Sequence, residues 1–147
     1  MLIKELSEKY NDYIIDRRRY YHQYPELTLQ EVETTKSIIK DLKDIGIEDI
    51  KTFKDFYGCV GILKGGKPGK TVLLRAVIDA LPVLEKTGLP FASKIEGKMH
   101  ACGHDNHIAM LLGAAKILFD MKDEVAGTVK FLFQPAEELA VGAKYYV

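Results

Sequence analysis

The sequence lacks the features that mark membrane, exported or nucleic-acid-binding proteins. None of its apolar runs approaches the roughly 20 residues that a membrane-spanning helix needs. Its first residues include acidic side chains and lack the basic-then-apolar layout of a signal peptide. Lysine and arginine together number 21, as do aspartate and glutamate, so no net charge would attract nucleic acid or an anionic membrane. We therefore expect neither kind of partner.

Cysteine is also scarce. Two cysteines and no export signal argue against a disulfide framework and predict a cytoplasmic protein. Cys59 lies in an apolar-rich segment and is expected to be a small buried thiol. Cys102 differs, because its neighbours are histidines and an aspartate. The one basic run, residues 17–19, fits a solvated or salt-bridged helix face better than a phosphate site.

A length of 147 residues suits one domain, which would bury roughly 70% of its unfolded surface. Apolar spacing predicts a helix over about residues 2–24, stopped by Pro25. A Thr-x-x-Glu capping box at residues 28–31 predicts the start of a second helix, and Gly46 is placed to end it. Strands are expected near residues 50–53, 59–64 and 71–76, with a hairpin turn at residues 65–69.

The second half of the chain begins with a long irregular segment, residues 79–105, that holds most of the chemically notable side chains. A third helix is expected to start at Asp105 or Asn106, either of which would cap it. A strand over residues 128–133 and the beginning of another helix follow. The run at residues 72–74 is apolar throughout, as in a strand covered on both faces. This order of elements predicts a layered α/β domain.

The most informative residues lie in two short segments, MHACGHDNH at residues 99–107 and QPAEE at residues 134–138. Thiol, imidazole and carboxylate together form a ligand set typical of zinc. Cys102 and His104 are two residues apart, so an extended turn lets both approach one point. Glu137 and Glu138 follow a strand, at the edge where α/β sheets place their sites. One could bind metal while the other takes a proton from water.

Several residues of these segments also fit simpler roles. Glu137 and Glu138 could form an exposed first helical turn. His100 and His107 fit outer-shell hydrogen bonding or helix capping better than metal ligation, and Asp105 could be no more than a helix N-cap. We expect these three residues, with Asp79, to support the site rather than to bind the metal. Cys102 could instead be a nucleophile, because imidazoles and a following helix lower a thiol pKa. That metal-free thiol hydrolase would leave the glutamate pair without a use.

At these residues the chain resembles the zinc amidohydrolases that include hippurate hydrolases, aminoacylases, N-acetyldiaminopimelate deacetylases and auxin-conjugate hydrolases. The resemblance spans nearly the whole chain. It is carried by RRRYYHQYPEL at residues 17–27, LRAVIDALP at 74–82 with the later Glu85, MHACGHD at 99–105, MLLGAA at 110–115 and FQPAEE at 133–138. It implies a three-layer, mixed-sheet catalytic domain of the zinc-exopeptidase type.

The resemblance also implies a function and the residues that perform it. Cys102, His104 and Glu138 would be metal ligands, with Cys102 bridging two metals, and Glu137 would be the general base. Asp79 would support the site from its strand end. Zinc suits the thiolate best, although manganese, cobalt or nickel would also fit. The substrate would be the amide of an N-acyl amino acid, such as a hippurate-like or N-acetyl compound.

Members of that family are much longer than this chain. We therefore expect residues 1–147 to be the N-terminal part of a truncated catalytic domain. The C-terminal part, with two further ligand histidines, would be absent, as would the lid domain through which the family typically forms homo-oligomers. On this interpretation the chain alone would be weakly active or inactive. The alternative is a non-catalytic remnant, or a subunit that needs a complementary C-terminal half.

Overall fold

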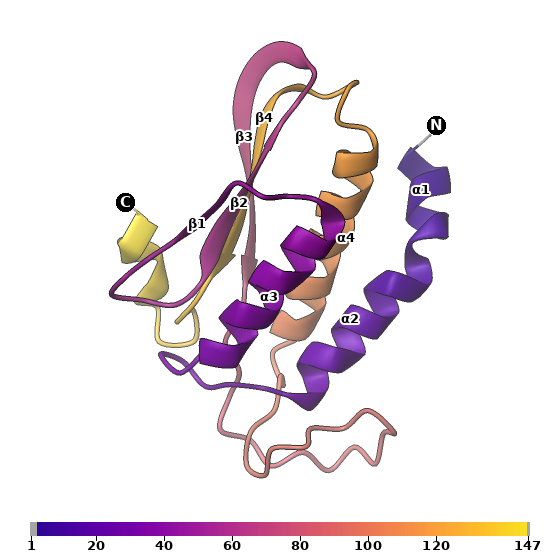
Figure 1. Cartoon of the computed structure of the whole chain (residues 1–147). Coiled ribbons are helices and arrows are strands. Elements are labelled where there is room, and N and C mark those ends of the chain that lie inside the picture. Colours follow the sequence, from indigo (N-terminus) through magenta and orange to yellow (C-terminus); the bar gives the residue numbers. More distant parts are fainter. Residues whose placement is uncertain (1–2, 147) are drawn as a thin grey trace.

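The computed structural model describes residues 3–146 and has an α/β fold built on one four-stranded sheet (Figure 1). The helices are α1 (Ile3–Lys9), α2 (Asn11–Gln23), α3 (Val32–Ile45), α4 (His104–Asp120) and a short 3-10 helix, η1 (Gly142–Tyr146). The strands are β1 (Ile50–Thr52), β2 (Cys59–Lys64), β3 (Lys67–Val77) and β4 (Ala126–Gln134). The predicted α/β class is confirmed.

The sheet is mixed, with the strand order β1-β2-β4-β3. β1 pairs with β2, and β2 with β4, in antiparallel fashion, whereas β3 and β4 run parallel. The predicted hairpin between β2 and β3 is therefore wrong, because β4 lies between them. Turn chemistry at residues 65–69 specifies a change of direction, but the long-range pairing of β4 decides which strands become neighbours.

The core lies between the sheet and the helices on one of its sides. Figure 1 shows α2, α3 and α4 together on that side and η1 on the other. Phe131 and Phe133 of β4 are fully buried and belong to the same hydrophobic cluster as Leu42 of α3 and Leu112 of α4. Gly46 ends α3 as predicted: its φ of 108° is left-handed, and its N–H donates to the carbonyls of Leu42 and Lys43.

Four local predictions need correction. The first predicted helix is divided at Tyr10 into α1 and α2, and its Leu2 lies outside the described residues. The capping box does not form, because α3 begins at Val32 and the Thr28 hydroxyl donates to Asp79 instead. The apolar run of residues 72–74 is not covered on both faces: β3 is at the sheet edge, with Val72 53% exposed. Finally, α4 begins at His104, after Gly103 as N-cap, so Asp105 lies inside the first turn.

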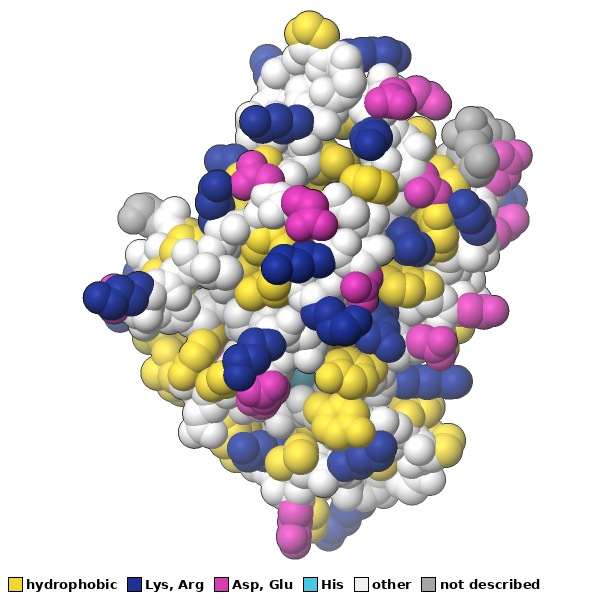
Figure 2. All heavy atoms as spheres, viewed as in Figure 1, with side chains coloured by type: hydrophobic (Ala, Val, Ile, Leu, Met, Phe, Trp, Pro, Cys, Tyr) yellow, Lys and Arg dark blue, Asp and Glu magenta, His cyan; other side chains and the backbone are white. Residues whose placement is uncertain are grey.

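The surface on the α2–α3 side carries both signs of charge. Figure 2 shows basic and acidic side chains interspersed over this face. The predicted salt-bridged character of residues 17–19 is confirmed for Arg17, which pairs with Asp41, and for Arg18, which pairs with Asp105. Within residues 3–146, no helix has the length and apolar character to cross a membrane.

Candidate metal centre

The structure brings the three predicted metal ligands together. One potential ligand atom from each of Cys102, His104 and Glu138 lies within 4.8 Å of the other two. Cys102 comes from the loop before α4, His104 is the first residue of α4, and Glu138 follows β4. His104 Nε2 is 3.7 Å from Glu138 Oε1 and 3.3 Å from Glu137 Oε2. Residues distant in the sequence therefore meet beyond the carboxyl ends of the parallel strands β3 and β4.

These side chains fit a divalent cation. The His104 imidazole is buried, and its Nδ1 donates to the backbone carbonyl of Asp79 at 2.8 Å, which leaves Nε2 directed at the carboxylates. Glu138 Oε1 is buried and has no hydrogen-bond partner among residues 3–146. A buried carboxylate oxygen without a donor, beside an imidazole nitrogen and a thiol, is satisfied by a metal ion. A hard oxygen, an imidazole and a thiol together suit zinc.

Asp79 forms hydrogen bonds with the segments that carry the candidate ligands. Its fully buried carboxylate accepts the backbone N–H groups of Glu137 at 3.1 Å and Glu138 at 2.9 Å, as well as the Thr28 hydroxyl at 2.7 Å. Burial by itself raises the pKa of Asp79, but the hydrogen bonds from His104, Thr28 and the two backbone groups outweigh it and lower the pKa to about 2. Asp79 thus contacts the imidazole of His104 and the backbone of the glutamate pair at once.

The thiol of Cys102 does not have the environment of a nucleophile. It is exposed, and the Glu138 carboxylate beside it raises its pKa. A thiolate nucleophile needs the opposite shift, which cations or a helix N-terminus provide. Cys59, by contrast, is fully buried, and burial raises its pKa to about 12, as expected for a packed thiol.

The other predicted supporting residues differ in their burial and in their contacts. His107 is exposed, and its ring stacks on that of His104 with 5.3 Å between ring centroids. His100 is buried, yet neither of its ring nitrogens has a hydrogen-bond partner in the described part of the chain, so the expected outer-shell bond is not formed there. Burial lowers the pKa of His100 to about 4. Asp105 belongs to a separate network.

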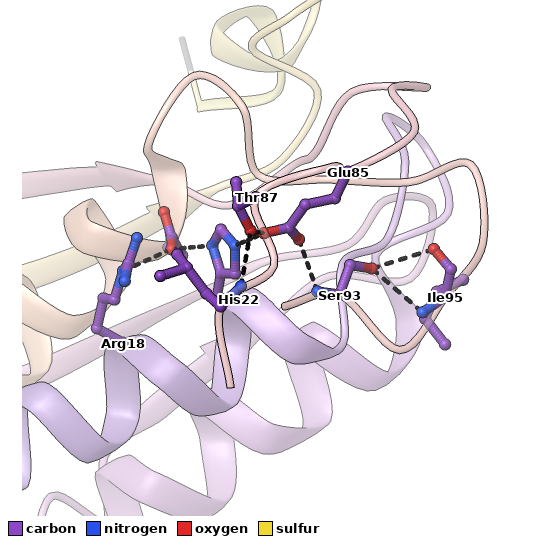
Figure 3. A network of polar contacts seen from close by, with 8 residues as sticks. Arg18, His22, Glu85, Thr87, Ser93 and Ile95 are labelled. Carbon is purple, nitrogen blue, oxygen red and sulfur yellow. Dashed lines mark hydrogen bonds and ion pairs between the residues drawn. The ribbon is translucent and has the colours of Figure 1, made fainter. Parts of the chain in front are cut away.

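That network, which we call the His22 cluster, consists of Arg18, His22, Glu85 and Asp105 (Figure 3). His22 lies between two carboxylates, with Nδ1 2.7 Å from Asp105 Oδ2 and Nε2 3.1 Å from Glu85 Oε1. Arg18 Nε is 2.9 Å from the same Asp105 oxygen. The cluster joins α2, the loop before α4 and the first turn of α4. It therefore fixes the helix on which His104 stands.

A cavity of about 590 Å³ opens beside the predicted ligands. Its walls come from the edge strand β3, from α4 and from the two segments that carry the ligands. The lining residues are Leu74, Arg75, Ala76, Val77, Cys102, His104, His107, Met110, Leu111, Ala114 and Glu137. Glu137 is 41% exposed, whereas Glu138 is 17% exposed, so Glu137 is the more open of the two carboxylates.

One contact of the site was missed by sequence reasoning. Glu31 is fully buried, and its Oε1 accepts the backbone N–H of Ala136 at 2.9 Å. In the sequence Glu31 was interpreted as part of a capping box, and no local pattern links it to a residue 105 positions later. His22 and Glu85, in contrast, both lie within motifs of the family resemblance.

Comparisons with known proteins agree with the motifs. Residues 73–147 match the model of "Peptidase family M20/M25/M40". The chain is 49% identical over 131 residues to "N-acetylcysteine deacetylase" from Bacillus subtilis, a match that covers 89% of this chain and 34% of that protein. It is 48% identical over 136 residues to "Thermostable carboxypeptidase 1" from Saccharolobus solfataricus, covering 92% of this chain and 35% of that protein.

A solved structure gives the same result. The Bacillus subtilis YXEP protein, described as a dinuclear metal-binding peptidase of the M20 family, matches with a TM-score of 0.88 and 47% sequence identity. The match covers 93% of this chain and 38% of that one. The chain thus spans about a third of the length of the curated relatives that it matches. Because the family model matches just over half of the chain, residues 73–147 of 147, the chain belongs to peptidase family M20/M25/M40.

Proposed function

We propose that this chain supplies the first metal-binding residues and the general base of an amidohydrolase that cleaves the amide bond of N-acyl amino acids. The observation that carries the proposal is the convergence of Cys102, His104 and Glu138 at the end of the sheet, with Glu137 adjacent. The Bacillus subtilis relative is named as an N-acetylcysteine deacetylase, which supports this substrate class.

Cys102, His104 and Glu138 would hold the metal. A divalent metal bound there supplies Lewis-acid polarisation of the substrate carbonyl and lowers the pKa of water. The Asp79 carbonyl keeps the His104 imidazole in the tautomer that presents Nε2 to the site. Glu138 is suited to ligation because its Oε1 atom is buried and has no hydrogen-bond partner in the described chain.

Glu137 would move the protons. Its carboxylate is the more exposed of the pair and lines the cavity, so both water and substrate can reach it. It accepts a proton from the attacking water and delivers it to the departing amine nitrogen as the C–N bond breaks. Its backbone N–H is held by Asp79, so the carboxylate stays beside His104 through both transfers.

A comparison of Glu137→Gln with Glu138→Gln tests these roles. Each variant is stripped with a chelator, reloaded with Zn²⁺ or Co²⁺, and assayed for bound metal and for release of the amino acid from N-acetyl amino acids and hippurate. Because the chain spans about a third of its relatives' length, we expect slow, metal-dependent turnover from the parent chain. Glu137→Gln should keep the metal and lose hydrolysis, whereas Glu138→Gln should lose both.

Cys59→Ala is the matched control, since it removes the buried cysteine and leaves the site intact. It should keep both metal and hydrolysis. Hydrolysis that survives chelation, or that is undiminished in Glu137→Gln, would contradict the proposed mechanism. Stoichiometric metal without any hydrolysis by the parent chain would contradict turnover by this chain alone.

A further inference from the structure

Three successive backbone N–H groups before and within the glutamate pair donate to two fully buried carboxylates. Asp79 accepts those of Glu137 and Glu138, through a different oxygen for each. Glu31 accepts the N–H of Ala136 at 2.9 Å. Each of residues 136–138 therefore has its backbone N–H bound, by Asp79 just after β3 or by Glu31 just before α3.

The hydrogen bond from Ala136 to Glu31 is made at a residue whose backbone conformation is unfavourable and requires stabilisation. Ala136 has a φ of +56°, in the left-handed region that residues other than glycine rarely adopt. This conformation turns the chain immediately after β4 and sets the direction in which the next two side chains leave the backbone. Ala136 is itself fully buried, so a bond to its N–H can reach it only from a neighbouring protein group.

Burying the carboxyl group of Glu31 in this position costs free energy. Burial raises the pKa of its carboxyl group, although backbone hydrogen bonds, that of Ala136 first among them, oppose the shift. Its second oxygen, Oε2, has no hydrogen-bond partner among residues 3–146. A buried acid of this kind contributes little to stability compared with an apolar side chain. The bond to Ala136 is the one that links this carboxylate to a segment 105 positions away in the sequence.

We propose that Glu31 is a positioning residue for the Glu137–Glu138 pair: by holding the N–H of Ala136 it maintains the turn that aims both carboxylates at His104. The acceptor oxygen, rather than the negative charge, is what the role requires. The assignment of the pair as base and ligand rests on the proposed function. The effect of Glu31 on the conformation of the segment does not, and the two are measured separately.

The first measurement is amide hydrogen exchange by NMR on the metal-free chain. In Glu31→Ala, exchange at Ala136, Glu137 and Glu138 should become about fivefold faster or more, as expected from loss of one hydrogen bond, while Phe131 and Phe133 in β4 keep their protection. Glu31→Gln should restore slow exchange at all three residues, because its amide oxygen can accept the same bond.

Glu26→Ala is the matched control. The Glu26 carboxylate also accepts backbone N–H groups at the start of α3, those of Glu33 and Thr34, but it does not contact Ala136. This variant should destabilise the first turn of α3 and leave exchange at the glutamate pair unchanged. The same acceleration at residues 136–138 in Glu26→Ala would overturn the proposal, because it would reduce the role of Glu31 to general support of the helix.

The second measurement is Co²⁺ affinity, by competition with a chromophoric chelator. Glu31→Ala should bind about 10- to 100-fold more weakly, as outer-shell substitutions do, and Glu31→Gln should bind like the parent. Unchanged exchange at residues 136–138 in Glu31→Ala, or equal losses in the Gln and Ala variants, would overturn the proposal. So would faster exchange with full Co²⁺ affinity. A parent chain that binds no Co²⁺ would refute the proposed function, and hydrogen exchange would then decide the role of Glu31.

Discussion

Two neighbouring residues at the start of α4, His104 and Asp105, belong to different polar clusters. The two clusters differ in the partners that their carboxylates have. Asp105 is buried in the His22 cluster, where its Oδ2 lies 2.7 Å from His22 and 2.9 Å from Arg18. His104 faces Glu137 and Glu138, and Glu138 Oε1 has no hydrogen-bond partner among residues 3–146. One oxygen of each cluster, Asp105 Oδ1 and Glu138 Oε1, is buried without a hydrogen-bond partner among residues 3–146. The difference is that Asp105 is paired with two basic side chains, whereas Glu138 converges with a thiol and an imidazole on one point, as metal ligands do.

The same comparison separates stability from binding. Substitutions in the His22 cluster should lower the free energy of unfolding of the metal-free chain. Substitutions at Cys102 and Glu138 should lower metal affinity and leave the metal-free fold nearly as stable. The predictions that follow test this separation.

The largest effect should follow from His22→Ala. The side chains of His22, Asp105 and Glu85 are each at most 4% exposed, so the substitution leaves two buried carboxylates without their shared partner. Breaking a buried pair in this way costs about 3–5 kcal/mol. Urea unfolding of the metal-free chain measures the loss. Lys40→Ala, which removes an exposed ion pair with Asp44, should cost about 0.5 kcal/mol or less. A His22→Ala loss as small as that of the control would refute the structural role of the cluster.

The next largest effect should be that of Glu138→Gln on metal binding. Loss of a direct ligand should exceed the effect of outer-shell changes and weaken Zn²⁺ binding by at least about 100-fold, or about 2.7 kcal/mol. The metal-free stability should change by less than about 0.5 kcal/mol, because Oε1 has no hydrogen bond to lose within the described chain. Competition titration and urea unfolding measure the two quantities. A large loss of stability with unchanged affinity would reverse the comparison.

Asp79→Asn should lower both the metal affinity and the free energy of unfolding, whereas substitutions in either cluster should mainly lower one of them. Asparagine keeps the shape of the side chain, but one of the two acceptor oxygens that hold Glu137 and Glu138 becomes an N–H donor. We expect Zn²⁺ affinity to fall by about 10- to 100-fold, together with a loss of about 1–3 kcal/mol in stability from the mispaired donors. Isothermal titration and urea unfolding measure both. An effect on stability alone would mean that Asp79 does not orient the site.

The smallest effect should be that of Arg18→Met. Its side chain is 28% exposed, and His22 continues to meet Asp105 after the substitution. We expect a loss of about 1 kcal/mol or less in the free energy of unfolding, and no change in metal affinity. A loss equal to that of His22→Ala would show that Arg18, rather than His22, is the main partner of Asp105.

Patterns that depend on near neighbours predicted much of the fold. The glycine at position 46 ends α3, and the strand at residues 59–64 lies where its composition indicated. The failures depend on distant residues. Thr28 has the spacing of a helix cap, but its hydroxyl is used by Asp79, 51 positions later. The turn after β2 reads as a hairpin, but β4 occupies the place beside β2.

In the candidate site, too, local patterns predicted some residues, whereas others depend on contacts between distant parts of the chain. Residue types and spacing made Cys102, His104 and the two glutamates candidates, because metal chemistry restricts which side chains can serve, and the family resemblance supplied the role of each. Asp105 was interpreted as a helix cap, since nothing local shows that His22 lies beside it. Glu31 was interpreted as part of a capping box, because no local pattern shows that the fold buries this acid against Ala136.

The measurement that tests the metal centre most directly is the optical spectrum of the chain during titration with Co²⁺. Coordination by Cys102 predicts a thiolate-to-cobalt charge-transfer band that grows to a stoichiometric end point. The band should vanish in Cys102→Ala and persist in Cys59→Ala, which removes the buried cysteine. A band that survives in Cys102→Ala, or a folded parent chain that develops none, would contradict a metal centre built on Cys102, His104 and Glu138.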